Sequence, residues 1–171
     1  MQPLYQAEGS LIQAHVGTYQ AYGLGKQFLT TAHDQQAIEH CALIDLTHLS
    51  RVGFRGQASA DYLKAFGLKL PDLPNFSIQQ DDGTRVARLS ATEYLILGSL
   101  DDFGESVAQL EARWSMTDQQ NFLLPRQDSH AWLQLTGRHI AQVMAKLCAV
   151  DLNAASFLPG QVVQTSIARI N

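Results

Sequence analysis

The sequence predicts an α+β protein built from two related small α/β lobes whose sheets are mostly antiparallel. Three observations lead to this fold class. Segments that alternate polar and apolar residues, as half-buried strands do, are interspersed with segments of helical spacing. An Asp-Gly turn joins two strand-like segments into a hairpin. One strand–glycine–helix pattern occurs twice along the 171 residues, and 46% of these residues are hydrophobic and can bury a core.

The first part of the chain alternates helices and strands after an extended lead-in. Thr30 or Thr31 can cap the first helix, and Ser99 or Asp101 the last one. The expected elements are, in order, a lead-in with short turns over 1–30, a helix over 32–41, an apolar run over 42–46, a strand over 50–55, a helix over 57–66, a hairpin with strands over 76–79 and 84–89, a strand over 93–97, a helix over 101–114 and a strand near 122–124.

The second part repeats the pattern with a constant offset. We expect a strand over 131–135, a helix over 138–148 and, after a Pro-Gly turn, a strand over 161–170. The offset of 81 residues that separates Gly56 from Gly137 also separates Ala60 from Ala141. We therefore expect a first lobe over 1–125, lead-in included, and a partial second lobe over 126–171, with chance similarity as the alternative.

Charge, apolar stretches and cysteine content limit the classes of function that this chain can have. The net charge is −4 and basic residues form no run, which argues against nucleic-acid binding. Apolar stretches are far shorter than the ~20 residues that span a bilayer, and no secretory signal is visible. We expect a cytoplasmic protein, in which Cys41 and Cys148 are two reduced, buried thiols, with a single disulfide between them as the alternative. Only 16% of residues are charged, which favours a chain that contacts a partner.

A block near the first strand resembles a known family. From Cys41 the chain reads as an apolar pair, Asp45, an aliphatic residue, a Thr and His48, followed by a strand that ends at Gly56 and an Ala-containing helix. This order resembles the opening block of the glycine-cleavage T-protein (aminomethyltransferase) family. The resemblance implies a T-protein-like folate-binding fold, and it spans about residues 38–171.

A second block narrows the resemblance. The run from Ala145 to Arg169, with Pro159-Gly160 inside it, resembles the gamma subunit of heterotetrameric sarcosine oxidase, a small relative of the T-protein fold. The resemblance implies a complex that demethylates sarcosine to glycine and passes the carbon unit to tetrahydrofolate. FAD, FMN and tetrahydrofolate would belong to that complex, and this chain would hold no cofactor and would pack against the catalytic subunits.

The first hairpin departs from the family's enzymes. By the resemblance, an acidic residue near the folate is expected there, but the chain has Val86 or Ala87 at that place. Neither side chain can accept or position a proton, so we expect no catalytic residue in this chain. The complex would be an oxidoreductase of which this chain is a non-catalytic part.

Asp45 and His48 are the only candidates for cofactor binding. They lie three residues apart and could form a polar pair near a folate pocket. Alternatively, Asp45 caps a turn and His48 bonds to the backbone. His33, His40 and Cys41 are too few ligands for a metal site, and we expect none.

The remaining polar motifs indicate surface roles. We interpret His130 and His139 as surface or interface residues. Gly23 to Lys26 lacks the full spacing of a phosphate-binding loop and is expected to be a turn. Arg85 and Arg88 should face opposite sides of a strand, where they either bind an acidic partner surface or are solvated.

Two alternatives to the subunit stay open at this stage. One is a stand-alone folate-dependent aminomethyltransferase-like protein, with Asp45 and His48 beside the pterin. The other is a self-associating structural module, for example a homodimer that forms by strand exchange at the C-terminal edge.

Overall fold

The computed structural model describes residues 19–22, 25–28 and 32–168. The lead-in expected over 1–30 therefore lies mostly outside the described residues, as do the side chain of His33 and half of the turn expected over 23–26. Within the lead-in, β1 (Tyr19–Tyr22) and β2 (Gly25–Phe28) form a separate antiparallel pair. No helix among the described residues is long and apolar enough to cross a lipid bilayer.

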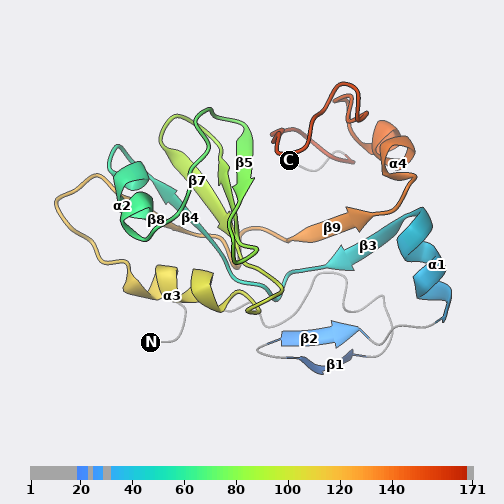
Figure 1. Cartoon of the computed structure of the whole chain (residues 1–171), viewed down its shortest axis with the longest axis horizontal. Helices are drawn as coiled ribbons and strands as arrows, with labels where there is room; N and C mark the ends of the chain where they lie inside the picture. The colour runs from blue at the N-terminus through green and yellow to red at the C-terminus, as the bar shows by residue number, and fades with distance from the viewer. Residues whose placement is uncertain (1–18, 23–24, 29–31, 169–171) are drawn as a thin grey trace.

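A five-stranded antiparallel sheet forms the larger part of the molecule (Figure 1). Its strands, in the spatial order β5-β6-β7-β4-β8, are β5 (Phe76–Gln79), β6 (Arg85–Arg88), β7 (Glu93–Leu97), β4 (Arg51–Arg55) and β8 (Phe122–Pro125). The predicted Asp-Gly hairpin joins β5 to β6, and the backbone N–H of Thr84 donates to Asp82 Oδ1 at 2.9 Å in its turn.

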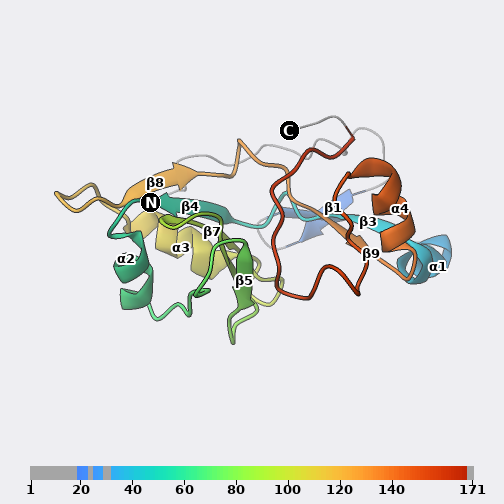
Figure 2. The same ribbon diagram turned by 90° about the horizontal axis from the view of Figure 1, so that it is seen from above.

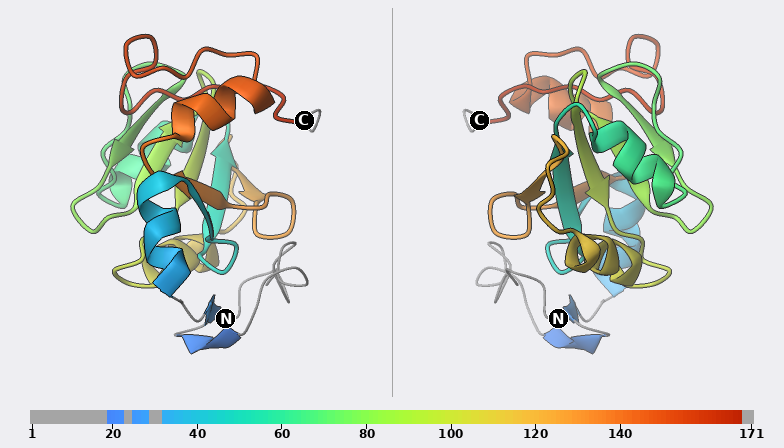
Figure 3. Two further views of the ribbon diagram at one scale, coloured as in Figure 1. Left: turned by 90° about the vertical axis from the view of Figure 1, so that its right-hand side faces the viewer. Right: turned by 90° about the vertical axis from the view of Figure 1, so that its left-hand side faces the viewer.

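Two helices cover one face of this sheet. The helices α2 (Ser59–Ala65) and α3 (Glu105–Arg113) bring apolar residues at helical spacing against alternate residues of the strands. The right-hand view of Figure 3 shows both helices beside the strands. The resulting core is closed, with each side chain at most 6% exposed: Val52, Phe54, Leu63, Val86, Tyr94, Ile96, Val107 and Leu110. We call the sheet with these two helices the sheet region.

The rest of the fold has fewer strands and a smaller buried core. It contains α1 (Ala32–His40), α4 (Ile140–Leu147) and a two-stranded antiparallel sheet of β3 (Ala42–Asp45) and β9 (Leu133–Thr136). Met144 and Cys148 are its buried hydrophobic residues among those described. We call this part the paired-strand region, and Figure 2 shows it beside the sheet region along the long axis.

The chain passes between the two regions twice. Residues 46–50 connect β3 of the paired-strand region to β4 of the sheet region, and residues 126–132 connect β8 back to β9. We call these two connections the crossing. They lie side by side, since the backbone N–H of Leu46 donates to the carbonyl of Trp132 at 2.9 Å. The expected division into two lobes at residue 125 stays a prediction. It would assign β3 to the first lobe and β9 to the second, although the two strands pair with each other.

The two strand–glycine–helix segments share one local geometry. Gly56 after β4 and Gly137 after β9 both have positive φ, 141° and 113°. A Cβ atom on Gly56 would overlap the carbonyl oxygen of Gln120, and one on Gly137 would lie 2.5 Å from the carbonyl oxygen of His40. Both positions therefore require glycine. An internal repeat remains a prediction, which this matched geometry supports.

The start of α3 differs from the prediction. The helix begins at Glu105 rather than at 101, because Phe103 and Gly104 adopt left-handed φ values of 55° and 80°. The N-cap residue is Gly104, not Ser99 or Asp101, and the carboxylate of Asp102, two residues earlier, accepts from the N–H groups of Gly104 and Ser106. Although burial alone would raise the pKa of Asp102, these hydrogen bonds hold it below its ordinary value.

The strand expected over 161–170 is wrong within the described residues, which end at 168. The segment makes only two isolated bridges, Phe76 with Gln161 and Cys148 with Ile167. It leaves the edge of β5 after two backbone bonds, from Ser77 N–H to Gly160 O and from Val162 N–H to Asn75 O. No described strand runs alongside it beyond that point, so a continuous ladder cannot form.

Candidate functional site

A buried arginine holds the crossing together. Arg51 is 2% exposed, and its guanidinium donates to four backbone carbonyls: Thr47 O (2.8 Å), Leu49 O (3.1 Å), Gln127 O (2.6 Å) and His130 O (2.7 Å). Burial lowers the pKa of Arg51, and the negative charges of Asp45 and Asp128 oppose this shift. Because both connections contribute carbonyls, one side chain ties them to each other.

Gln127 completes the same network. Its Oε1 accepts from the backbone N–H of Arg51 at 3.3 Å, and its Nε2 donates to Thr47 O at 3.0 Å. The side chains of Arg51 and Gln127 are thus paired with the backbone of the crossing, whereas the buried hydroxyl of Thr47 has no hydrogen-bond partner in the structure. These bonds position the backbone and commit Arg51 and Gln127 to the fold rather than to a ligand.

Asp45 is the last residue of β3, and His48 lies within the crossing. Asp45 Oδ1 accepts from the N–H of Thr47 at 3.0 Å, as the turn-capping alternative expects. His48 is half-buried, and the described part of the chain supplies no hydrogen bond to its imidazole, so the expected bond to the backbone is not found. The arrangement fits a local structural role for Asp45. A role of this pair in cofactor binding stays a prediction.

The five-stranded sheet has a second face, opposite α2 and α3, and we call it the open face. Val86 is paired with Ile96 and points into the core, whereas Ala87, paired with Leu95, lies on the open face and is 5% exposed. Of the two residues that stand where the resemblance implies an acid, Val86 is thus enclosed in the core and Ala87 is buried on the open face, and neither side chain carries a proton-transfer group.

An ion cluster that sequence reasoning missed lies on this open face. Glu93 pairs with Arg126 at 3.0 Å and with Arg55 at 3.8 Å. The Arg126 side chain crosses Gly53, whose added Cβ would lie 3.0 Å from Arg126 Nε. The only sequence signal was the glycine inside a strand, which often marks a close approach by another group. The carboxylate of Glu93 is engaged by both arginines.

Arg85 and Arg88 lie on opposite faces, as predicted. Arg85 is on the open face and donates to Ser77 Oγ and Gln79 Oε1. The guanidinium of Arg88 lies 5.7 Å from the Tyr94 ring centroid. It also donates to the backbone carbonyls of Pro71, Asp72, Ser90 and Ala91. Arg88 therefore fixes two loops. Of these two arginines, Arg85 is the one on the open face, where a partner could contact it.

The histidines and cysteines that the structure describes form no metal-binding cluster. His130 and His139 are exposed, as expected, and the His139 ring stacks on His40 with centroids 5.7 Å apart. Cys148 is buried, but Cys41 is only half-buried because it lies at the end of α1, and the two are not bonded to each other. Among the described residues, no three potential metal ligands come together.

Comparison with known proteins identifies the fold. A structure of heterotetrameric sarcosine oxidase from Corynebacterium sp. U-96, in complex with pyrrole 2-carboxylate, contains a chain that matches with a TM-score of 0.58 and 22% identity, over 81% of this chain and 74% of the other. The glycine cleavage system aminomethyltransferase T from Bartonella henselae matches with a TM-score of 0.56 and 18% identity, over 80% of this chain but only 41% of its own. No protein-family model and no curated protein matches.

At these identities the likeness shows the fold alone: a small α+β domain with antiparallel sheets, similar to T-protein folds. The two matched chains differ in length relative to this one. The matched chain in sarcosine oxidase is comparable in length to this one, whereas this chain spans less than half of the aminomethyltransferase.

Proposed function

We propose that this chain is a non-catalytic, gamma-type subunit of a heterotetrameric sarcosine oxidase-like complex, which oxidatively demethylates sarcosine to glycine and passes the one-carbon unit to tetrahydrofolate. The observation that carries the proposal is the pair Val86 and Ala87, because only aliphatic, buried side chains stand where the related enzymes are expected to hold an acid. The likeness to a chain of comparable length within a sarcosine oxidase supports the same assignment.

The residues of the hairpin do not fit a folate-dependent transfer. On the open face, the carboxylate of Glu93 is held by Arg55 and Arg126. Asp45 caps a turn at the crossing. We therefore derive no chemical step through folate or flavin on this chain and assign both to the partner subunits.

The paired-strand region offers the surface through which the chain would act. Leu43, Leu133 and Leu135 lie on one face of the β3–β9 sheet, because Leu43 is opposite Leu135 and Leu133 is opposite Asp45. Leu43 is 50% and Leu133 41% exposed. A two-stranded sheet is marginal by itself, and exposed leucines on its face are typical of a surface that a partner covers.

Co-purification tests the proposal. The tagged chain, expressed in its native host, should retain a flavoprotein detectable by its flavin absorbance. Leu133→Arg should reduce the recovered flavoprotein at least about tenfold, since a charge in a buried apolar contact costs more than 1.4 kcal/mol. Leu73→Arg is the matched control, because Leu73 is 62% exposed in a loop of the sheet region. Recovery of the wild-type chain without any flavoprotein would refute the subunit assignment.

The stand-alone aminomethyltransferase is distinguished by a direct titration. Tetrahydrofolate added to the isolated chain should show no micromolar binding if the chain is a non-catalytic subunit. Micromolar binding that is lost in Asp45→Asn and His48→Gln would favour the enzyme instead.

A further inference from the structure

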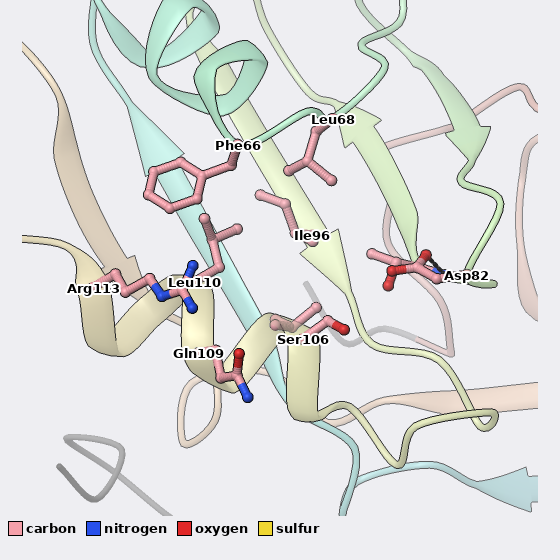
Figure 4. A pocket seen from close by; sticks show the side chains of 10 residues that line it. Phe66, Leu68, Asp82, Ile96, Ser106, Gln109, Leu110 and Arg113 are labelled. Carbon is pink, nitrogen blue, oxygen red and sulfur yellow. Dashed lines mark hydrogen bonds between the residues drawn. The ribbon is translucent and has the colours of Figure 1, made fainter.

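A small pocket lies on the helix-covered side of the sheet region, away from the open face (Figure 4). It has a volume of about 250 Å³ and is bounded by the end of α2, the β5–β6 turn, β7 and α3. A cavity of 150 Å³ is known to hold benzene, so this pocket can hold one ring with short substituents. It shares no residue with the crossing or with the ion cluster.

The pocket has an apolar middle and two oppositely charged ends. Leu68, Ile96 and Leu110 form the middle, and the partly exposed ring of Phe66 lies at its border. Figure 4 shows the Asp82 carboxylate at one end and the Arg113 guanidinium at the other, with Ser106 and Gln109 along one side. A ligand would thus bury its apolar part and keep charged groups at both ends.

The end near the β5–β6 turn favours a cation that also donates hydrogen bonds. Asp82 lines this end of the pocket, and the carboxylate of Asp101, which does not line it, lies beside the same turn, because a Cβ on Gly83 would lie 3.0 Å from Asp101 Oδ2. Thr84, which lines the pocket and is 2% exposed, keeps a buried hydroxyl that has no hydrogen-bond partner in the structure. A buried hydroxyl without a partner is unfavourable, so a ligand that forms a hydrogen bond with the Thr84 hydroxyl would remove this cost.

We infer that this pocket binds a small dipolar ligand: one ring or branched apolar body with an ammonium group toward Asp82 and a carboxylate toward Arg113. The charges fix the orientation, since the reversed ligand would place like charges together at both ends. The pocket is open on one side, so the expected affinity is modest.

Titration of the whole chain with 4-(aminomethyl)benzoate, followed by the amide resonances of residues 82–84 and 106–113, tests the inference. Saturable shifts should appear below about 10 mM, the range expected for a small ligand in an open site. Asp82→Asn and Arg113→Gln should each weaken binding about two- to fivefold, as for a partly exposed ion pair. Asp82→Asn retains the oxygen that accepts from the Thr84 N–H, so the turn is preserved.

The controls separate the site from general charge effects. Asp118→Asn and Arg138→Gln change the same charges outside the pocket and should leave the affinity unchanged. Benzylamine and benzoate, each with only one charged end, should bind more weakly than the dipolar probe. Equal binding of the three compounds, unchanged affinity in both pocket variants, or no saturation below about 10 mM would overturn the inference.

Discussion

The sheet region and the paired-strand region are built from similar local pieces but differ in how completely they bury them. Both contain a strand that ends at a positive-φ glycine and runs into a helix. In the sheet region, five strands and two helices enclose a core with every member at most 6% exposed. In the paired-strand region, two strands leave Leu43 and Leu133 about half exposed.

The difference shows that a local pattern does not determine whether an element is self-sufficient. Hydrophobic stabilisation follows the apolar area removed from water, and five strands remove far more than two. The paired-strand region therefore depends on what it is attached to, first the crossing and then, in the proposed complex, a partner. The following predictions test this comparison.

The largest contrast is expected between two leucines. Leu63 on α2 is fully buried, so Leu63→Ala should lower the free energy of unfolding by about 2–5 kcal/mol. Leu43 on β3 is 50% exposed, and Leu43→Ala should change it by less than about 0.5 kcal/mol in the isolated chain. Urea unfolding of both variants measures the contrast. Similar losses in the two would show that the paired-strand region has a closed core after all.

The next contrast concerns the link between the regions. Arg51→Met removes all four guanidinium bonds across the crossing and should cost about 1–3 kcal/mol, since it leaves buried carbonyls without partners. Hydrogen exchange at the Leu46 amide should accelerate. Arg55→Met, on the same strand with a 66% exposed side chain, is the control and should have little effect. Unaltered protection of Leu46 in Arg51→Met would mean that the crossing is held by other contacts.

The smallest effect is a pH dependence inside the otherwise apolar side of the sheet region. Glu111 on α3 is 6% exposed; burial raises its pKa, and the charge of Asp128 raises it further. A raised pKa means that this carboxyl favours folding below its unfolded-state pKa and loses that contribution as the pH rises through its folded-state pKa. Glu111→Gln should therefore gain stability relative to wild type as the pH increases.

Thermal unfolding at several pH values measures this trend. Glu105→Gln, from the exposed first turn of the same helix, gives the baseline for the loss of one carboxylate. A difference between Glu111→Gln and wild type that stays constant between pH 3 and 8, an interval of about five units around the carboxyl range, would contradict the assignment.

The local elements could be predicted from the sequence, and the long-range contacts could not. The hairpin at Asp81–Gly83 and the alternation from Glu93 to Leu97 are written in neighbouring residues, and the structure contains both. The pairing of β3 with β9 and the passage of Arg126 over Gly53 depend on segments far apart in the chain. The composition of one of these segments does not specify which distant segment it will contact.

Two of the wrong expectations concern secondary structure. Residue type favours Ser99 or Asp101 as the cap of α3, but the left-handed backbone at Phe103 and Gly104 makes Gly104 the N-cap, and Asp102 accepts from the first N–H groups. The segment 161–168 has the composition of a strand, but strand formation also requires a free edge alongside it. At the candidate site, Asp45 could be found by its motif, whereas Arg51 gave no signal beyond its place at the start of a strand.

The crossing also determines the order in which the molecule can assemble during synthesis. β3 ends at Asp45 and its partner β9 begins only at Leu133, so the ribosome must add almost 90 residues before the pair can close. At elongation rates of 5–20 residues per second, β3 has no partner strand for about 4–18 s. For that interval the nascent chain presents the edge of β3 and the apolar side chain of Leu43 to the surrounding proteins, and the second connection must then pass beside the first before the molecule is complete.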